Sequence, residues 1–224
     1  MNFIDLGIIE RIISLGEFCY SRLHPSRFSI YDYTQDKVRM PFDGCTTPYV
    51  AMCDLIESNF LDFERNLEVR EKNIYNTKMN IKYNHEKNLD VESVAAQLVL
   101  RKNQFINALQ NAKNTVVFFL TYKKYPSEII NIIQMKYPNL KFKIFTLDWS
   151  AYPTIKNRIV DDKCTYINLP LPDKTYSNWK DVETPIGQIY EKKVLLEFLN
   201  FLSEINNINY DMETVFSNRT NYSW

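Results

Sequence analysis

The sequence predicts an α/β fold: a single domain with a mostly parallel sheet, helices on both faces and a small β-hairpin insertion. The run over 115–120 is continuously apolar, which is typical of a strand buried on both faces. A helical pattern over 127–136 and an extended pattern over 141–147 follow it at the spacing of a βαβ unit. Apolar residues make up 45% of the 224 residues, enough to fill the core of one sizeable domain.

The N-terminal half contains shorter elements, punctuated by proline and glycine. In chain order, we expect a helical turn over 2–11, a buried strand over 12–15, a helix over 17–23, a short strand entering a turn over 38–44 and a helix over 47–59. The loose alternation over 73–84 predicts a β-hairpin that turns near 76–78. Asp90 is the expected N-cap of a long amphipathic helix that runs to Ala112.

The C-terminal half continues the α/β pattern. A short strand is expected over 164–169 and an amphipathic helix over 186–202. We therefore assign residues 1–204 to the α/β domain. The remaining residues, 205–224, are rich in Asn and Ser and are expected to form a C-terminal tail.

Charge balance and residue usage argue against several classes of function. Lys plus Arg and Asp plus Glu both number 27, so no broad basic face for nucleic acid is expected. The chain has four glycines, and they do not cluster as a phosphate-binding loop requires. With four cysteines, no CxxC pair and two histidines, we expect no structural zinc site, no other metal and no cofactor.

The chain shows no pattern that would direct it to a membrane. It contains no run of about 20 apolar residues and no signal-peptide pattern at its start. We therefore expect a cytoplasmic protein with reduced thiols and no membrane partner. The oligomeric state is left open.

Cys19 is the leading candidate for a catalytic residue. It follows a strand pattern and Gly16, and it stands at the start of a predicted helix. The partial positive charge of a helix N-terminus favours thiolate over thiol and lowers a cysteine pKa, so this position suits a nucleophile. The alternative is a small buried apolar residue, which is the more common role of a free cysteine.

A cysteine nucleophile needs a base within hydrogen-bond reach and usually a third group that orients the base. His85, directly after the predicted hairpin, is the better candidate base; His24 lies on or just past the Cys19 helix and would point elsewhere. Asp43, in a Pro-Phe-Asp-Gly turn, and Asp148, at the end of a predicted parallel strand, are the candidate orienting residues. Each also has a plain alternative role in a loop or turn.

Two basic pairs have weaker claims to function. Arg101 and Lys102 lie on the long predicted helix, where a solvated face is the expected role and binding of an anionic substrate is the alternative. Lys123 and Lys124 follow the strand over 115–120 and are expected either in a polar loop or facing an anion at the sheet edge.

Ordered blocks of the sequence resemble the DUF1796 family, which is described as papain-like cysteine peptidases. The blocks are Ile13-Ser-Leu-Gly-Glu-Phe-Cys19, Arg39-Met-Pro-Phe-Asp-Gly44, Tyr83-Asn-His-Glu86, Leu100-Arg-Lys-Asn-Gln-Phe105 and Val116-Val-Phe-Phe119. The resemblance implies a nucleophile at Cys19 and a histidine partner at His85. The chain departs from the family at Gly44, where tryptophan is usual, and at Glu86, where aspartate is common.

The predicted function is cysteine-dependent acyl chemistry, as a hydrolase or acyltransferase acting on a peptide, amide or acyl ester. Cys19 attacks a carbonyl, His85 acts as base and then as acid, and Asp43 or Asp148 orients the imidazole. Two alternatives from other classes stay open. One is a glycosyl- or nucleotidyl-transferase-like enzyme that uses the sheet edge, and the other is a non-catalytic binding module with a decayed site.

Overall fold

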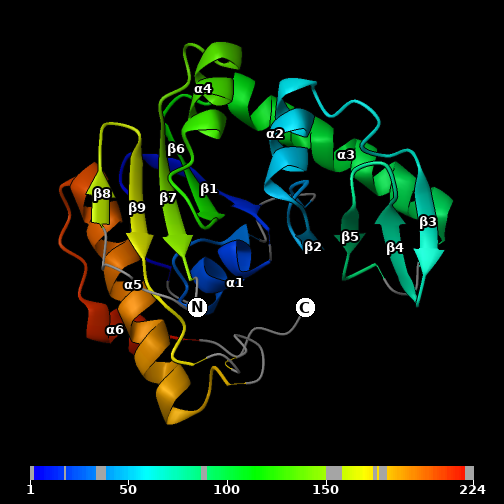
Figure 1. Ribbon diagram of the computed structural model, residues 1–224. Coiled ribbons are helices and arrows are strands. Elements are labelled where there is room, and N and C mark those ends of the chain that lie inside the picture. Colours follow the sequence, from blue (N-terminus) through cyan, green and yellow to red (C-terminus); the bar gives the residue numbers. More distant parts are fainter. Residues whose placement is uncertain are drawn as a thin grey trace.

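The protein folds as an α/β domain with two sheets (Figure 1). The computed structural model describes residues 3–17, 19–33, 39–86, 90–149, 158–173, 176 and 181–219. A five-stranded, mostly parallel sheet carries helices on both faces, and a smaller antiparallel sheet lies to one side of it (Figure 1). The predicted fold class is confirmed.

The larger sheet has the strand order β1-β6-β7-β9-β8. Its strands are β1 (Ile9–Gly16), β6 (Thr115–Thr121), β7 (Phe142–Asp148), β9 (Cys164–Asn168) and β8 (Arg158–Val160). The first four run parallel, each beside the next one in this order, and β8 pairs antiparallel with β9 at the edge. Every residue of β6 is buried, as expected for a central strand of a doubly covered parallel sheet.

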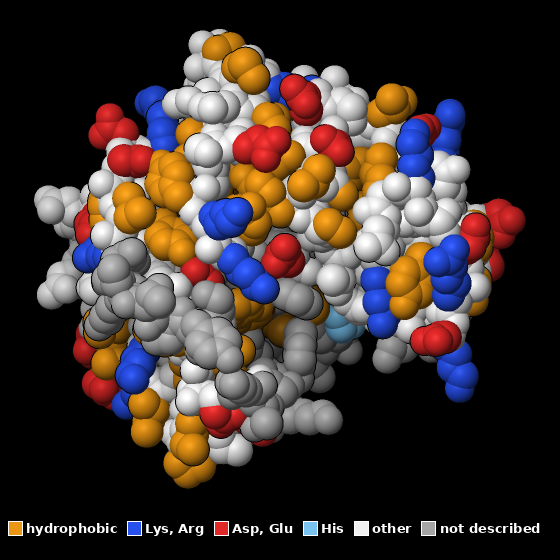
Figure 2. Space-filling model, viewed as in Figure 1, with side chains coloured by type: hydrophobic (Ala, Val, Ile, Leu, Met, Phe, Trp, Pro, Cys, Tyr) orange, Lys and Arg blue, Asp and Glu red, His pale blue; other side chains and the backbone are white. Residues whose placement is uncertain are grey.

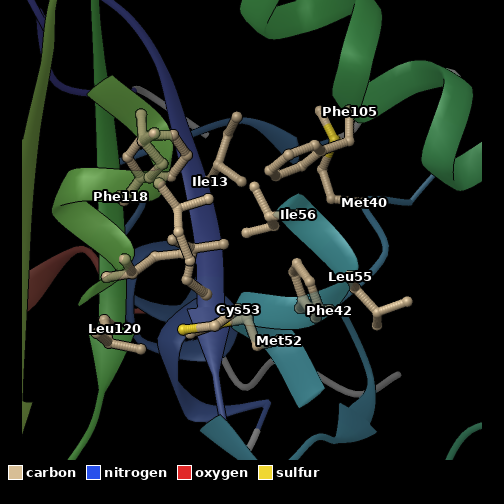
Figure 3. Packing of buried hydrophobic residues seen from close by; sticks show 14 of the residues in the cluster. Ile13, Met40, Phe42, Met52, Cys53, Leu55, Ile56, Phe105, Phe118 and Leu120 are labelled. Carbon is tan, nitrogen blue, oxygen red and sulfur yellow. The ribbon is translucent and has the colours of Figure 1, made fainter. Parts of the chain in front are cut away.

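One face of this sheet packs against α2 (Tyr49–Glu57), α3 (Val91–Gln110) and α4 (Ser127–Lys136). Figure 3 shows Ile13 of β1 and Phe118 of β6 among side chains from α2 and α3. Successive residues of a strand point to opposite faces, so alternate residues belong to this cluster: Ile13 and Leu15 of β1, and Val116, Phe118 and Leu120 of β6. The β6–α4–β7 segment is the predicted βαβ unit.

The opposite face packs against α1 (Tyr20–Arg27), α5 (Pro185–Asn206) and α6 (Met212–Ser217). Phe119 of β6 and Phe198 of α5 are central to this second cluster, with ring centroids 4.9 Å apart. The two clusters together make three layers, with helices on either side of one sheet.

The smaller sheet is antiparallel, with the order β2-β5-β4-β3. Its strands are β2 (Cys45–Thr46), β5 (Ile81–Tyr83), β4 (Asn73–Asn76) and β3 (Leu67–Arg70). The predicted hairpin corresponds to β4 and β5, and β3 and β2 extend it to four strands. The Asn76 amide donates to the carbonyl oxygens of Asp62, Phe63 and Arg65, which fastens the loop before β3 to this sheet.

Two predictions for the N-terminal half are wrong. The segment predicted as a helical turn over 2–11 leads instead into β1, because Ile9 and Arg11 already pair with Thr115 and Val116 of β6. Of the short strand expected to enter a turn over 38–44, the strand is wrong and the turn is confirmed. Residues 39 and 40 form no strand, residue 38 lies outside the described residues, and the turn over residues 41–44 is closed by the Asp43 N–H, which donates to the Met40 carbonyl at 3.1 Å. In the first segment, pairing with a distant strand outweighs the helical propensity of the residues. In the second, the hydrogen bond from the Met40 N–H to the Asp43 side chain favours a turn over a strand.

The long helices begin at the residues that cap them. Asp90 accepts the Ser93 N–H at 2.7 Å, which confirms it as the N-cap of α3, and Thr184 accepts the Gly187 N–H at 3.1 Å at the start of α5. The segment predicted as a tail contains α6, whose Val215 and Phe216 are buried against the core. None of the helices in the described ranges combines the length and the apolar content of a membrane span.

Candidate functional site

Cys19 stands where the first parallel strand passes into α1. It is the N-cap residue of α1, and its carbonyl accepts the N–H groups of Arg22 and Leu23 at 3.1 and 3.0 Å. The carboxyl ends of parallel strands form the edge of a sheet where ligands usually bind. Cys19 therefore has the backbone position predicted for it, but the residue is only 3% exposed.

The expected lowering of the Cys19 pKa is wrong. Burial raises the pKa of the Cys19 thiol to about 11, and the negative charge of Asp43 adds to the rise. The free energy lost when a thiolate is removed from water exceeds the stabilisation that the partial charge of an eight-residue helix gives the thiolate. At neutral pH Cys19 is accordingly a thiol, and any nucleophilic chemistry requires a base that removes its proton.

Asp43 occupies the turn over residues 41–44 and is completely buried. Its carboxylate accepts the Met40 N–H at 2.8 Å and forms an ion pair with the Arg22 guanidinium. Burial raises the pKa of Asp43, while the neighbouring Arg22 opposes that rise. Because Arg22 lies on the first turn of α1 with Cys19, this ion pair joins the turn to the start of that helix.

His85 lies against the next residue of the same turn. The β2–β5 ladder pairs Cys45 with Tyr83, and the Asn84 N–H donates to the Gly44 carbonyl at 3.1 Å. This register places His85, which is half-buried, so that a Cβ on Gly44 would lie 3.1 Å from its Cδ2 atom. Gly44 has a φ of +76°, in the left-handed region that favours glycine.

A second buried cysteine, Cys45, directly follows the turn over residues 41–44. The Cys45 sulfur lies 3.0 Å from the Thr47 hydroxyl oxygen and 3.6 Å from the Pro41 carbonyl oxygen, and the residue is completely buried. Burial raises the pKa of Cys45 to about 12, and the charges of Asp43 and Cys19 contribute to the rise. The negative charge of Asp43 therefore raises the pKa of both thiols.

Two further arginines and a glutamate complete the charged cluster. Arg101 forms an ion pair with Glu86, and both side chains are buried. The Arg39 guanidinium lies 3.8 Å from the same carboxylate oxygen. The prediction that Arg101 lies on a solvated face is wrong, because Val94, Leu98 and Arg101 follow helical spacing and share the buried stripe of α3.

The sequence pointed to Cys19, Asp43 and His85, but it did not show that arginines act on the Asp43 carboxylate. Arg22 follows Cys19 by three residues, a spacing that places both on one side of a helix. Arg101 belongs to an apolar stripe, where a charged residue is uncommon unless it is paired. These two patterns were the signals in the sequence that could have marked Arg22 and Arg101. Neither pattern identifies the carboxylate that pairs with the arginine.

Asp148 and His24 lie in other surroundings. Asp148, the last residue of β7, accepts the Tyr166 hydroxyl at 2.6 Å and the Asn168 amide at 2.8 Å. His24 is completely buried on the opposite face of the sheet, with its ring 4.9 Å from that of Phe28. Burial, together with the positive charge of Arg27, lowers the pKa of His24 to about 3, so it is a neutral part of the core.

The surface also carries a separate groove of about 570 Å³ along α5. Figure 2 shows hydrophobic side chains at the surface over the end of α5 near the bottom of the view. Ile186, Ile189 and Tyr190 line this groove, and none of the candidate residues Cys19, Asp43 and His85 is among its lining residues. Within the described ranges, no three His, Cys, Asp or Glu side chains gather as metal ligands would.

Comparisons with known proteins identify no relative. No family model, no curated protein and no solved structure matches the chain.

Proposed function

We propose that the protein is a cysteine-dependent acyl-transfer enzyme, a hydrolase or an acyltransferase of the papain-like type. Cys19 is the nucleophile and His85 the base. The substrate is a peptide, an amide or an acyl ester, since all three present a carbonyl to a sulfur nucleophile.

The observation that carries the proposal is that one turn, over residues 41–44, faces His85 and acts electrostatically on Cys19. Gly44 lies against the His85 ring, and the preceding residue, Asp43, interacts electrostatically with Cys19. The turn thus links Cys19 and His85, which come from separate parts of the chain. A nucleophile, a half-buried imidazole and a buried carboxylate in one place are the components that thiol acyl transfer requires.

The raised pKa of Cys19 determines how the first step runs. With a pKa of about 11, only about one thiol in ten thousand is ionised at pH 7. His85 therefore acts as a general base: it takes the thiol proton while sulfur forms a bond to the carbonyl carbon. It then returns the proton to the leaving amine or alcohol as the carbon–heteroatom bond breaks, which leaves a thioester on Cys19.

Backbone and buried charge assist the two transition states. The first N–H groups of a helix have no intrahelical acceptor, so those at the start of α1 serve as donors to the oxyanion. In the proposal Asp43 orients the imidazole, and its ion pair with Arg22 holds the carboxylate in place. Water then attacks the thioester in a hydrolase, or an amine or alcohol attacks it in a transferase.

The test compares alkylation of the four cysteines in the native protein by iodoacetamide at pH 7, measured by peptide mass spectrometry. Cys53 is an internal control, because it is 1% exposed and burial raises its pKa to about 12. We expect Cys19 to react about tenfold faster than Cys53 or more, because in the proposal His85 removes the proton of the Cys19 thiol.

The matched variants identify the base. His85→Asn should slow alkylation of Cys19 to the rate of Cys53, whereas Lys82→Gln, on the neighbouring strand β5, should leave it unchanged. If Cys19 reacts no faster than Cys53, or if His85→Asn has no effect on its rate, the proposal is wrong and a binding module becomes the better description.

A further inference from the structure

A second groove, of about 670 Å³, lies between α2 and the turn that joins β4 to β5. Val50, Asp54 and Glu57 line it from α2, Leu61 lines it from the loop after that helix, and Met79 lines it from the turn. Figure 2 shows Asp and Glu side chains beside hydrophobic ones at the surface over α2, in the upper part of the view. The candidate catalytic residues are not among its lining residues, so the groove is a separate feature of the molecule.

Part of this groove is apolar. Val50 and Leu61 are 64% and 63% exposed, although both are large apolar side chains. The inner face of α2, which includes Met52 and Ile56, packs into the core. The helix therefore directs apolar side chains toward solvent as well as toward the core, whereas the outer face of a surface helix is ordinarily polar. Apolar side chains that gather in one exposed groove are typical of an interaction site.

The groove also carries unbalanced negative charge. Asp54 and Glu57 are exposed, lie one helical turn apart and form no ion pair with any residue that the structure describes. The lysine of the groove, Lys78, is already paired with Asp62 at 2.7 Å. Burial is the main cause of the raised pKa of the Cys53 thiol beneath the groove, and the charges of Asp54 and Glu57 add to the rise. The two carboxylates are therefore available to a cation from outside the chain.

We propose that this groove binds a basic amphipathic helix of a partner protein, an interaction that does not depend on the thiol chemistry. The apolar row of such a helix packs against Val50 and Leu61, and its Lys or Arg side chains pair with Asp54 and Glu57. Residues three or four positions apart lie on one face of a helix, so basic side chains one turn apart match the spacing of the two carboxylates. The same negative charge disfavours nucleic acid as the occupant.

Two synthetic peptides that differ in charge test the proposal. Both form helices of about four turns with one stripe of leucine, and the flanking positions carry lysine in one peptide and glutamate in the other. Binding of each labelled peptide to the full chain is measured by fluorescence anisotropy, and amide shifts in NMR spectra identify the residues contacted. We expect the lysine peptide to bind at least about tenfold more tightly than the glutamate peptide, and to shift the amides of α2.

The variants identify the groove as the site. Asp54→Asn combined with Glu57→Gln should weaken binding of the lysine peptide about tenfold, and Val50→Ser should weaken it about fivefold. Reversal of both charges, by Asp54→Lys with Glu57→Lys, should make the glutamate peptide the tighter ligand. The controls are Glu71→Gln, in the exposed turn between β3 and β4, and Leu100→Ser, at an exposed position of α3; both should bind within about twofold of the wild type. Circular dichroism checks that each variant is folded.

Several outcomes overturn the proposal. One is that neither peptide binds at about 1 mM, and another is that the two bind equally well. Wild-type affinity for the lysine peptide in Val50→Ser, or in the variant with both carboxylates neutralised, places the binding site elsewhere and also overturns it. Sedimentation velocity tests self-association: a dimer that Val50→Ser dissociates assigns the groove to a second copy of this chain instead of a basic partner.

Discussion

Gly44 and His85 are in van der Waals contact across the junction of the turn and the small sheet, and a Cβ on Gly44 would lie 3.1 Å from His85 Cδ2. The imidazole occupies the space that a side chain at position 44 would need. The φ of +76° at Gly44 lies in the left-handed region, which glycine adopts readily, and the backbone turns there beside the His85 ring. The absence of a side chain at Gly44 thus leaves room for the candidate base.

Gly44→Ala should therefore disturb both stability and reactivity. The left-handed backbone disfavours alanine by about 1–2 kcal/mol, and the new methyl group displaces the His85 ring. We expect a lower free energy of unfolding in urea and slower alkylation of Cys19. Gly7→Ala is the control: Gly7 has a φ of +52°, and its added Cβ would lie 3.0 Å from the Asn206 side chain, so it should lose stability while Cys19 reacts at the wild-type rate.

Asp43→Asn should destabilise the protein strongly. It leaves the buried Arg22 guanidinium without its ion pair to Asp43, and removing one partner of such a pair costs about 3–5 kcal/mol. Glu68→Gln removes the exposed ion pair with Arg70 and should cost less than about 1 kcal/mol. Urea denaturation of both variants measures the difference. Equal losses would show that the buried Arg22–Asp43 pair contributes no more to stability than the exposed Arg70–Glu68 pair.

The same Asp43 variant should lower the pKa of Cys19. Burial is the main cause of the raised value, and the negative charge of Asp43 is a further one, so the pKa should fall below about 11 without reaching that of a free thiol. Thiolate absorbance at 240 nm, titrated against a Cys19→Ser background of each protein, measures this. An unchanged or higher Cys19 pKa in Asp43→Asn would contradict the electrostatic coupling between these residues.

His24 should make the protein sensitive to acid. Its pKa is lowered to about 3 by burial and by Arg27, whereas the unfolded chain has the ordinary value of about 6.5. As pH falls through 6.5 the unfolded state takes up the proton first, so His24 removes stability progressively between pH 6.5 and 3. By linkage this loss amounts to about 5 kcal/mol in total.

His24→Leu tests that assignment. Leucine is an apolar side chain that can fill much of the buried space of the imidazole. The substitution also removes two ring nitrogens that have no hydrogen-bond partner among the described residues. We expect it to be at least as stable as the wild type at pH 7, and increasingly more stable than it as pH falls to 3. Parallel free-energy curves for the two proteins over this range would refute the prediction.

Gly187→Ala should disrupt the start of α5. In a helix, alanine is ordinarily favoured over glycine by about 1 kcal/mol. Here a Cβ would lie 1.9 Å from the carbonyl oxygen of Asp181, a backbone atom that cannot move aside without unwinding the loop before the helix. We expect a net loss of about 1–3 kcal/mol in thermal or urea unfolding. Ile189→Ala, at an exposed position of the same helix, is the control and should have a small effect.

The sequence alone was sufficient for the fold class and for the backbone position of Cys19. The apolar run of β6, the alternation of the hairpin and the cap at Asp90 are local patterns, and each is produced by forces acting within a few residues. Local patterns also marked Asp43 as a turn residue and left one well-placed histidine, His85. They failed over 2–11, where pairing with a strand a hundred residues away decides the structure.

Only the tertiary structure decided the electrostatics of the site. Whether a thiol at a helix start has a low or a high pKa depends on how much protein surrounds it, and burial outweighs the helix dipole at Cys19. Which carboxylate faces which arginine depends on the packing of α1, α3 and the turn over 41–44, elements that the chain brings together from distant positions. Periodicity predicts which face of a helix is buried, but the partner found there is a property of the folded molecule.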